Sequence, residues 1–316
     1  MPAPDLWGQY ATRAAAADAL VCVMVELPHA PGRAAPRLRG DYARAAADYT
    51  VQQQWRDYGA DAHDIWRLLY ARQMQSTARF GVPETLAGLR QLGAEPDRIP
   101  DFAIVNQRLE AATGWRIVAV PGLIPDEHFF AHLASKQFPV SVWIRERSEL
   151  DYLSEPDLFH DFFGHVPLLA DPVFARFMQA YGRAGEKALA HGAVPMLARL
   201  YWYTVEFGLI DTAAGLRAYG AGILSSLGET HYSIESPVPH RLRFDLERIL
   251  RTKYLIDEFQ CTYFVIDSFE QLFQACYQID FAPLYRKLGG LPAIDPGVVL
   301  PEDRVVDAAS GSPACG

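Results

Sequence analysis

His160 and His165 are the residues whose type and spacing most directly indicate chemistry, because two imidazoles this close together resemble half of a metal site. A third ligand is available in Glu206, the only charged residue of the apolar segment Tyr201–Leu209, where a carboxylate buried without a partner would be costly. Two neutral imidazoles and one carboxylate form the set that holds ferrous iron in mononuclear oxygenases and leaves coordination positions open. The three residues therefore predict an iron site.

The spacing of the two histidines requires a bend in the chain. Residues five apart on a straight α-helix point about 140° away from each other, so they cannot bind one ion as residues four apart do. Gly164 relaxes the backbone before the second histidine, and Pro167 disfavours helix soon after it. These residues predict a helix that begins near Pro156 and ends close to His165.

Asp157 lies three residues before His160 and on the same helical face, so we expect it to accept the second imidazole proton of that histidine. The alternative is that both histidines are buried residues satisfied by ordinary hydrogen bonds. A zinc hydrolase with the same three ligands and a non-catalytic protein without metal also remain open. A 2-oxoglutarate-dependent oxygenase is disfavoured, since the chain contains no His-x-Asp or His-x-Glu triplet.

Three motifs resemble those of the pterin-dependent aromatic amino acid hydroxylases. They are Glu-Pro-Asp-x-x-His-Asp-x-x-Gly-His-Val-Pro-Leu, Trp-Tyr-Thr-Val-Glu-Phe-Gly-Leu and Tyr219-Gly-Ala-Gly-Ile-Leu-Ser-Ser-Leu-Gly-Glu229, in the family's order and with similar spacing. The resemblance runs from about Tyr49 to about Leu284, and the short form is similar to the bacterial phenylalanine 4-hydroxylases. It implies a single catalytic domain that is mainly α with a few short β-strands (α+β).

The resemblance also implies a reaction. A non-haem iron monooxygenase with Fe²⁺ and tetrahydrobiopterin, or a related tetrahydropterin, would convert L-phenylalanine to L-tyrosine with dioxygen. The alternative is a hydroxylase of the same family that acts on tryptophan or another aromatic amino acid. Ile256 is expected to border the substrate ring, and an apolar wall leaves a second phenolic hydroxyl unpaired, which favours phenylalanine over tyrosine.

The implied metal and substrate roles fall on particular residues. His160, His165 and Glu206 match the iron ligands. Arg145 matches the arginine that binds the substrate carboxylate, for which a guanidinium offers two parallel hydrogen bonds. The alternation of Val140, Val142 and Ile144 predicts a half-buried strand that ends at this arginine. The other expected substrate contacts are Ser225, Trp202 and Ile256. Ser225 is also expected to hydrogen-bond a histidine ligand, and Trp202 could instead be a core residue. Asp157 and Glu229 are expected to lie just outside the iron ligands.

The implied cofactor positions are in Pro121–Phe129 and at Asp161. Backbone groups of Gly122, Leu123 and Ile124 are expected to hold the pterin, and the ring of Phe129 is expected to stack on it, with a place in the core as the alternative. Asp161 stands where animal relatives have glutamate, so its shorter side chain weakens the expected contact with the pterin through water.

Composition limits the other classes of function. The formal net charge of −9 and the absence of basic runs argue against nucleic-acid binding. The four cysteines, Cys22, Cys261, Cys276 and Cys315, show no paired spacing and predict free thiols in a reducing compartment. The apolar segment Ala14–Leu27 is too short to span a membrane and lacks a basic start. We therefore expect a cytoplasmic enzyme without membrane or nucleic-acid partners.

The chain is expected to contain an N-terminal extension at 1–48, partly flexible, a catalytic domain at 49–300 and a disordered tail at 301–316. Without room for a regulatory domain or a tetramerisation helix, it is expected to be a monomer. Pro83 to Gly93 and Asp101 to Gly114 predict amphipathic helices, and alternating Trp115, Ile117 and Ala119 predict a strand. Ser268 with Gln271 predicts a capping box for a helix through Cys276.

Overall fold

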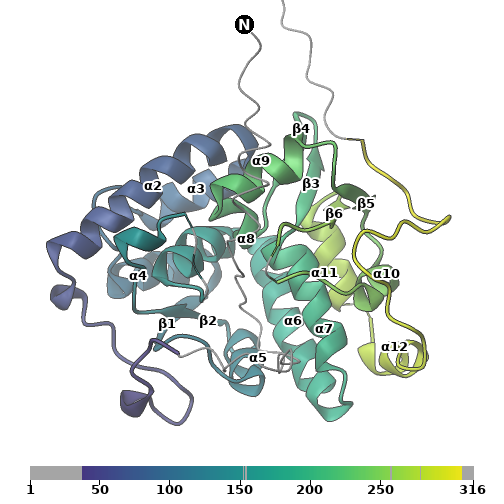
Figure 1. Cartoon of the computed structure of the whole chain (residues 1–316). Helices are drawn as coiled ribbons and strands as arrows, with labels where there is room; N and C mark the ends of the chain where they lie inside the picture. The colour runs from purple at the N-terminus through teal and green to yellow at the C-terminus, as the bar shows by residue number, and fades with distance from the viewer. Residues whose placement is uncertain (1–37, 152, 154, 257, 278, 308–316) are drawn as a thin grey trace, which may run out of the picture.

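The computed structural model describes residues 38–151, 153, 155–256, 258–277 and 279–307 (Figure 1). Within these residues helices dominate and the strands are short, which confirms the predicted α+β class. The α-helices are α2 Ala60–Phe80, α3 Pro83–Leu92, α4 Phe102–Thr113, α5 Asp126–Ala134, α6 Pro172–Ala190, α7 Val194–Tyr201, α8 Ala221–Leu224, α9 Leu227–Glu235, α10 Leu246–Arg251, α11 Phe269–Tyr277 and α12 Phe281–Leu288. Short 3₁₀ turns lie at Tyr42–Arg44, Trp55–Asp57, Arg147–Glu149 and Val166–Ala170, and π-helical turns lie at His160–His165 and Trp202–Glu206.

The strands form two small sheets. In the first, β1 (Arg116–Val120) pairs in parallel with β2 (Gln137–Ser141). The second has the order β4-β3-β6-β5, in which β3 (Leu209–Thr212) and β4 (Gly215–Ala218) form an antiparallel hairpin. Its parallel pairs join β6 (Thr262–Ile266) to β3 and to β5 (His240–Arg243). Every residue of β6 is buried, as expected of a central strand that is covered on both faces.

Several predicted elements are confirmed, because their end signals are local. Helix α3 has Pro83 in its first turn and ends at Gly93, whose φ of 68° is left-handed. Helix α4 begins after Asp101, whose carboxylate accepts the backbone N–H of Ala103, and it ends at left-handed Gly114. The alternating residues after Gly114 form β1.

Two local predictions were wrong in detail. Strand β2 ends at Ser141, well before Arg145, and all its residues after Gln137 are buried. A half-buried pattern therefore does not apply to it, because both of its faces are covered. The capping box at Ser268 is also incomplete. The Ser268 hydroxyl accepts the Gln271 N–H at 3.3 Å, but the Gln271 side chain accepts the N–H of Asp267 instead of that of Ser268.

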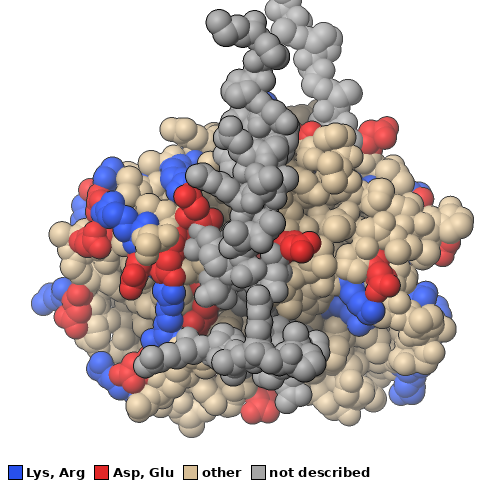
Figure 2. Space-filling view, viewed as in Figure 1, with Lys and Arg blue, Asp and Glu red and all other residues tan. Residues whose placement is uncertain are grey.

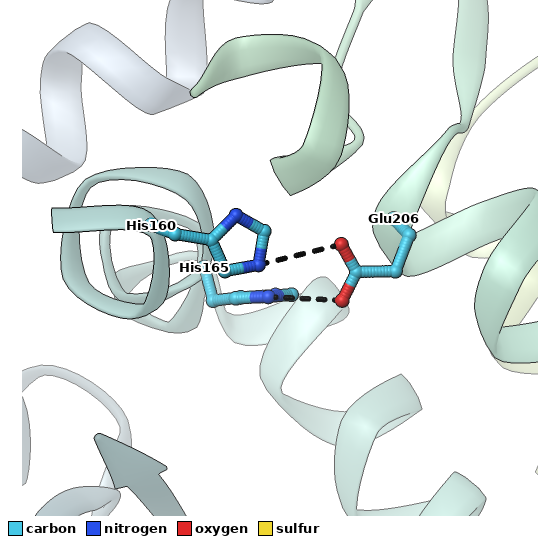
Figure 3. A group of neighbouring side chains, drawn as sticks. All are labelled: His160, His165 and Glu206. Carbon is cyan, nitrogen blue, oxygen red and sulfur yellow. Dashed lines mark ion pairs between the residues drawn. The ribbon is translucent and has the colours of Figure 1, made fainter. Parts of the chain in front are cut away.

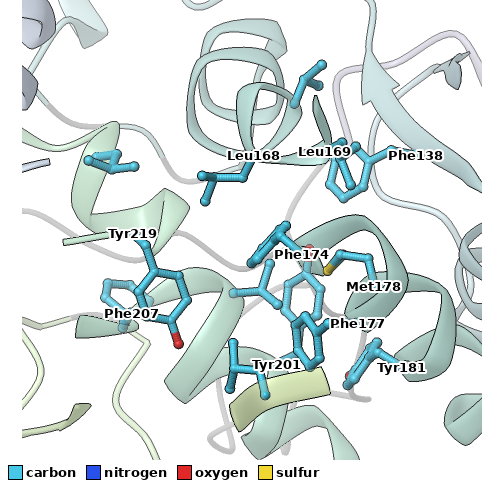
Figure 4. Close-up of a cluster of buried hydrophobic side chains, with 14 of the residues drawn as sticks. Phe138, Leu168, Leu169, Phe174, Phe177, Met178, Tyr181, Tyr201, Phe207 and Tyr219 are labelled. Atoms are coloured by element: carbon cyan, nitrogen blue, oxygen red, sulfur yellow. The ribbon is translucent and has the colours of Figure 1, made fainter. Parts of the chain in front are cut away.

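A large aromatic core joins the helices to the histidines. Helices α6 and α7 lie side by side (Figure 1), and the buried rings of Phe138, Phe177, Tyr181 and Tyr201 pack between them and their neighbours (Figure 4). A Cβ atom at Gly185 of α6 would lie 2.1 Å from the ring of Phe130 on α5, so this close helix contact requires glycine. The core thus fixes the elements that carry the candidate site.

The C-terminal end of the described chain packs on the domain. The Arg248 guanidinium forms a buried ion pair with Asp303 at 3.0 Å, and the Val306 N–H donates to Arg241 O at 2.7 Å. The part of the predicted disordered tail up to residue 307 is therefore held in place, because it neutralises a buried charge and extends the pairing of β5. The predictions for 1–37 and 308–316, including Ala14–Leu27, lie outside the described residues.

Two features of the composition, the charges and the cysteines, can be located among the described residues. On the face shown in Figure 2, Lys and Arg side chains are interspersed with Asp and Glu and form no separate basic patch. Cys261 and Cys276 are free thiols, whereas Cys22 and Cys315 lie outside the described residues. Among the helices that the structure describes, none combines the length and the apolar character needed to cross a bilayer.

Candidate metal centre

A π-helical turn brings the two histidines onto one side of the backbone. The helical segment begins at Leu158, later than predicted, and widens into a π-helix from His160 to His165. Hydrogen bonds between residues five apart close this wider turn, so residues five apart share a face, which a straight α-helix forbids. The helix does not stop at His165 as predicted but tightens into the 3₁₀ turn Val166–Ala170, whose first turn accommodates Pro167 without losing a hydrogen bond.

Gly164 has a different role from the predicted one. A Cβ atom at this position would lie 2.7 Å from Ala221 Cβ and 3.0 Å from Ala221 O on α8, which is closer than real Cβ contacts. The glycine therefore permits α8 to pack directly against the π-helical turn. The bend that joins the histidines comes from the π-helix instead.

Glu206 faces both histidines from a second π-helical turn (Figure 3). Its Oε1 lies 3.2 Å from His165 Nε2 and its Oε2 lies 3.6 Å from His160 Nε2. One ligand atom from each residue lies within 4.8 Å of the other two, and all three side chains are buried. The structure thus brings the predicted trio together in a space that one metal ion could share.

The electrostatics of the trio favour a cation. Burial lowers the pKa of His160 to about 4, so its ring is neutral and can offer a lone pair near pH 7. Burial alone would raise the pKa of Glu206, but the facing His165 and His160 rings outweigh it and lower that pKa. His160 Nε2, His165 Nε2 and Glu206 Oε1 have no hydrogen-bond partner among the described residues, and buried polar atoms without partners are costly. A bound cation would satisfy all three atoms.

Ser225 orients the first histidine. Its Oγ lies 2.9 Å from His160 Nδ1, so the predicted hydrogen bond to a histidine is present. When Nδ1 donates to Oγ, the lone pair lies on Nε2, which faces Glu206. The prediction for Asp157 was wrong, because its Oδ1 accepts the backbone N–H of His160 at 3.0 Å and does not contact the imidazole.

Arg145 is buried and already paired. Its Nε and Nη2 donate to Oδ2 and Oδ1 of Asp157 at 2.8 and 2.9 Å, so the two-bond fork predicted for the substrate carboxylate is occupied by a protein carboxylate. The other edge of the guanidinium, around Nη1, is the part that a substrate could meet. Asp157 therefore fixes the orientation of Arg145.

The implied cofactor loop, defined here as 121–125, connects β1 to α5. Phe129 on α5 is 6 % exposed and makes edge contacts with Phe138 and with Tyr201, at 6.5 and 5.6 Å between ring centroids. Both of those rings also contact His165, at 4.9 and 6.1 Å. Phe129 therefore contacts two rings that in turn contact His165. It lies in the core, which was the alternative to stacking on the pterin.

Asp161 joins the π-helical turn to the end of β2. Its Oδ2 accepts the Ser141 N–H at 2.8 Å, while its buried Oδ1 has no hydrogen-bond partner among the described residues. Burial raises the pKa of this carboxyl to about 7. The group is thus able to donate or accept a hydrogen bond near neutral pH.

Trp202 is packed as a core residue. Its indole is 1 % exposed, stacks on Tyr254 at 4.3 Å between ring centroids, and donates from Nε1 to Gln260 Oε1 at 3.0 Å. Direct contact with a substrate ring therefore requires movement of Trp202 or its neighbours. Ile256, in the segment that follows Tyr254, is half-buried against the same core.

Sequence reasoning missed several residues around the site. Gln260 and Tyr263 both hydrogen-bond Glu229, whose pKa burial raises to about 7. Tyr42 and Glu155 contact the cofactor loop. Only Glu155 had a usable signal, its place in the Glu-Pro-Asp motif; the others are brought to the site by chain segments distant in sequence.

Comparison with known proteins gives consistent matches. The family model described as biopterin-dependent aromatic amino acid hydroxylase matches residues 30–282. Phenylalanine-4-hydroxylase of Chromobacterium violaceum is 57% identical over 263 residues, covering 83% of this chain and 88% of that protein. The Ralstonia nicotianae protein of the same name is 56% identical over 263 residues, covering 83% of this chain and 84% of its own.

A solved structure supports the fold directly. Phenylalanine hydroxylase from C. violaceum bound to cobalt is similar, with a TM-score of 0.82 and 56% identity, over 83% of this chain and 95% of that one. That structure contains bound cobalt.

Proposed function

Because this chain belongs to the biopterin-dependent aromatic amino acid hydroxylases, we propose that it is a phenylalanine 4-monooxygenase. It converts L-phenylalanine to L-tyrosine with dioxygen, placing one oxygen atom on the ring and the other on a tetrahydropterin co-substrate. The observation that carries this proposal is the buried trio of His160, His165 and Glu206, whose facing donor atoms lack partners among the described residues. The similar proteins named as phenylalanine hydroxylases favour this substrate over tryptophan.

We assign Fe²⁺ to the trio. Two neutral nitrogens and one carboxylate oxygen on one face are the donor set of non-haem ferrous oxygenases. When bound there, iron supplies the redox chemistry that activates dioxygen. The protein contributes the fixed ligand face, the neutral state of His160 and a wall of aromatic side chains that keeps bulk water out.

The substrate sites are proposed from the family resemblance and the local contacts. The Nη1 edge of Arg145 would bind the substrate carboxylate, and Ser225, which hydrogen-bonds His160, would contribute a second contact. Ile256 would border the substrate ring, and Trp202 would border it only after its stack on Tyr254 shifts. Glu229, which accepts hydrogen bonds from the Tyr263 hydroxyl and the Gln260 N–H, would support the site without touching the substrate.

The pterin would lie against the cofactor loop. Backbone groups of Gly122, Leu123 and Ile124 would hold its polar edge, and Phe129 would provide an aromatic face. Asp161 would meet it through the Oδ1 atom that has no partner among the described residues. We also propose that the protein acts in the cytoplasm, which the free thiols of Cys261 and Cys276 support, and that it is a monomer.

Anaerobic loading of the purified protein with Fe²⁺ tests the function. We expect oxygen uptake that requires both tetrahydropterin and phenylalanine, with tyrosine as product and slower reactions with tyrosine or tryptophan. Glu206→Gln should abolish product and weaken iron binding by more than the roughly 10- to 100-fold that losing an outer hydrogen-bond partner costs. The control variant Glu229→Gln changes a buried carboxyl outside the trio and should retain iron. Near-normal turnover of Glu206→Gln would show that Glu206 is not an iron ligand.

A further inference from the structure

The cofactor loop is held by residues far from it in sequence. The hydroxyl of Tyr42, in the 3₁₀ turn Tyr42–Arg44, donates to the backbone carbonyl of Leu123 at 2.9 Å. We propose that Tyr42 is a positioning residue for the tetrahydropterin: by fixing the Leu123 peptide, it keeps the backbone groups of the cofactor loop in their binding arrangement. This inference rests on the proposed function, since it assumes that the pterin binds at 122–124.

The packing around Gly122 shows how closely the loop is held. A Cβ atom at Gly122 would lie 2.9 Å from the Tyr42 hydroxyl and 2.8 Å from Glu155 Oε1. The loop therefore contacts both side chains at a distance that only glycine permits. A shift of the loop toward Tyr42 or Glu155 is sterically blocked, and a shift away from Tyr42 breaks its hydrogen bond.

Glu155 lies on the other side of the loop, where its Oε1 would be 2.8 Å from a Cβ atom at Gly122. Burial raises the pKa of its carboxyl, and the nearby Arg39 opposes that rise. The Arg39 N–H donates to Oε2 at 3.3 Å. The cofactor loop is thus placed between the Glu155 carboxylate, on the side of Gly122, and the Tyr42 hydroxyl, which binds the Leu123 carbonyl. We call Arg39, Tyr42 and Glu155 the loop clamp.

Arg39 anchors the clamp to the rest of the domain. Its guanidinium forms an ion pair with Glu149 and lies over the ring of Trp143, 5.1 Å from the ring centroid. A half-exposed ion pair alone contributes little stability, but a bidentate pair combined with a cation–π contact fixes the path of the chain. Tyr42 is therefore presented to Leu123 by an anchored segment.

The loop clamp is expected to affect the affinity for tetrahydropterin more than the rate of the chemical step. If the loop is mobile before binding, part of the binding free energy is used to order it, and the apparent affinity falls. The clamp's hydrogen bonds join Tyr42 to Leu123, the Arg39 guanidinium to Glu149 and the Arg39 N–H to Glu155, and none of these bonds involves the metal trio or Arg145. Loss of the Tyr42 hydroxyl should therefore raise the Michaelis constant for tetrahydropterin and leave the other constants unchanged.

The test is Tyr42→Phe in the full-length, iron-loaded enzyme. Since one hydrogen bond contributes about 0.5 to 1.5 kcal/mol, we expect the tetrahydropterin KM to rise about three- to ten-fold. The kcat at saturating pterin, the phenylalanine KM and the iron affinity should stay at wild-type values. An unchanged pterin KM in an active, folded variant overturns the proposal.

Tyr58→Phe is the matched control. The Tyr58 hydroxyl is also half-buried and donates to a loop carbonyl, Val142 O, at 2.6 Å, but it does not contact the cofactor loop. It should lower thermal stability to a similar extent without raising the pterin KM, and an equal rise in both variants would show a merely structural effect. Anaerobic calorimetry of tetrahydropterin binding measures the clamp even if no tyrosine forms, so a failure of the proposed reaction is separately visible.

Discussion

Arg145 and Asp157 form a buried ion pair with two parallel hydrogen bonds, Nε to Oδ2 at 2.8 Å and Nη2 to Oδ1 at 2.9 Å. Asp157 Oδ2 also accepts the backbone N–H of Arg145, and its Oδ1 accepts that of His160. One carboxylate therefore orients the guanidinium proposed to bind the substrate and the backbone of a proposed iron ligand. The proposed substrate and metal positions are therefore linked through Asp157.

Asp157→Asn tests the link. The variant leaves a buried guanidinium without its counter-charge, so we expect a loss of about 3 kcal/mol in the free energy of unfolding and a higher phenylalanine KM. Iron affinity should change little, because the asparagine oxygen can still accept the His160 N–H. Denaturant unfolding, steady-state kinetics and metal titration measure the three quantities.

A second buried pair provides the control. Arg248 and Asp303 are similarly enclosed but hold the C-terminal segment instead of the site. Asp303→Asn should therefore lower stability without changing the phenylalanine KM. If Asp157→Asn also leaves that constant at its wild-type value, Arg145 does not depend on Asp157 for substrate binding.

Ser225→Ala removes the hydrogen-bond partner of His160 Nδ1. Outer hydrogen bonds fix the tautomer and ring orientation of a ligating histidine, so iron affinity should fall about ten-fold. Calorimetric titration with Fe²⁺ or Co²⁺, without substrate, measures this effect alone. Ser233→Ala is the control, since Ser233 is buried and donates to Thr230 O on α9, away from the trio; equal losses in both variants would contradict a specific role for Ser225.

Gly164→Ala should separate α8 from the π-helical turn. The added methyl would meet Ala221 at 2.7 Å, and overpacking of this kind costs about 1 to 3 kcal/mol. Because Ser225 caps α8, we expect weaker iron binding as well as lower thermal stability. Gly59→Ala is the control, since no atom lies within 4 Å of its Cβ position and its φ is −71°. Wild-type iron affinity in Gly164→Ala would show that α8 tolerates the shift.

The metal trio was predictable from the sequence because residue type alone restricts the choice. Two close histidines and an isolated carboxylate in an apolar segment favour a shared cation over separate hydrogen-bonded burial of each group. Helix ends such as Gly93 and Gly114 were predictable because their signals are local. The hydrogen bond from Ser225 to a histidine followed from the family resemblance, not from any periodic pattern.

The remaining contacts were not predictable because they depend on how the backbone is wound. The helix begins at Leu158, so Asp157, placed beside the His160 imidazole by α-helical spacing, lies at the N-cap and accepts the backbone N–H of His160 instead. The Arg145–Asp157 pair forms across an irregular segment that has no period. Tyr42 and Leu123 are 81 residues apart and meet only in the folded domain.

Glu229 provides a prediction for the effect of pH on stability. Burial raises its pKa from 4.5 to about 7, although Tyr263 and the Gln260 N–H act in the opposite direction. Between these two pH values the folded protein binds more protons at this group than the unfolded chain does. The contribution of Glu229 to stability is therefore most favourable below about pH 4.5 and decreases as the pH rises to about 7.

Glu229→Gln removes this dependence while keeping the shape and an acceptor for Tyr263. The unfolding free energy of wild type relative to the variant should therefore fall as the pH is raised from 5 to 8, by an amount on the order of 3 kcal/mol. His160 has the opposite effect, because its pKa is lowered in the folded protein and its protonation destabilises the fold as the pH falls below about 6. This contribution is the same in both proteins, so it cancels in the difference. Urea unfolding of both proteins at pH 5, 6, 7 and 8 measures this difference in unfolding free energy. If the two plots of unfolding free energy against pH are parallel, Glu229 is ionised in the folded protein and held as a carboxylate by the Tyr263 hydroxyl.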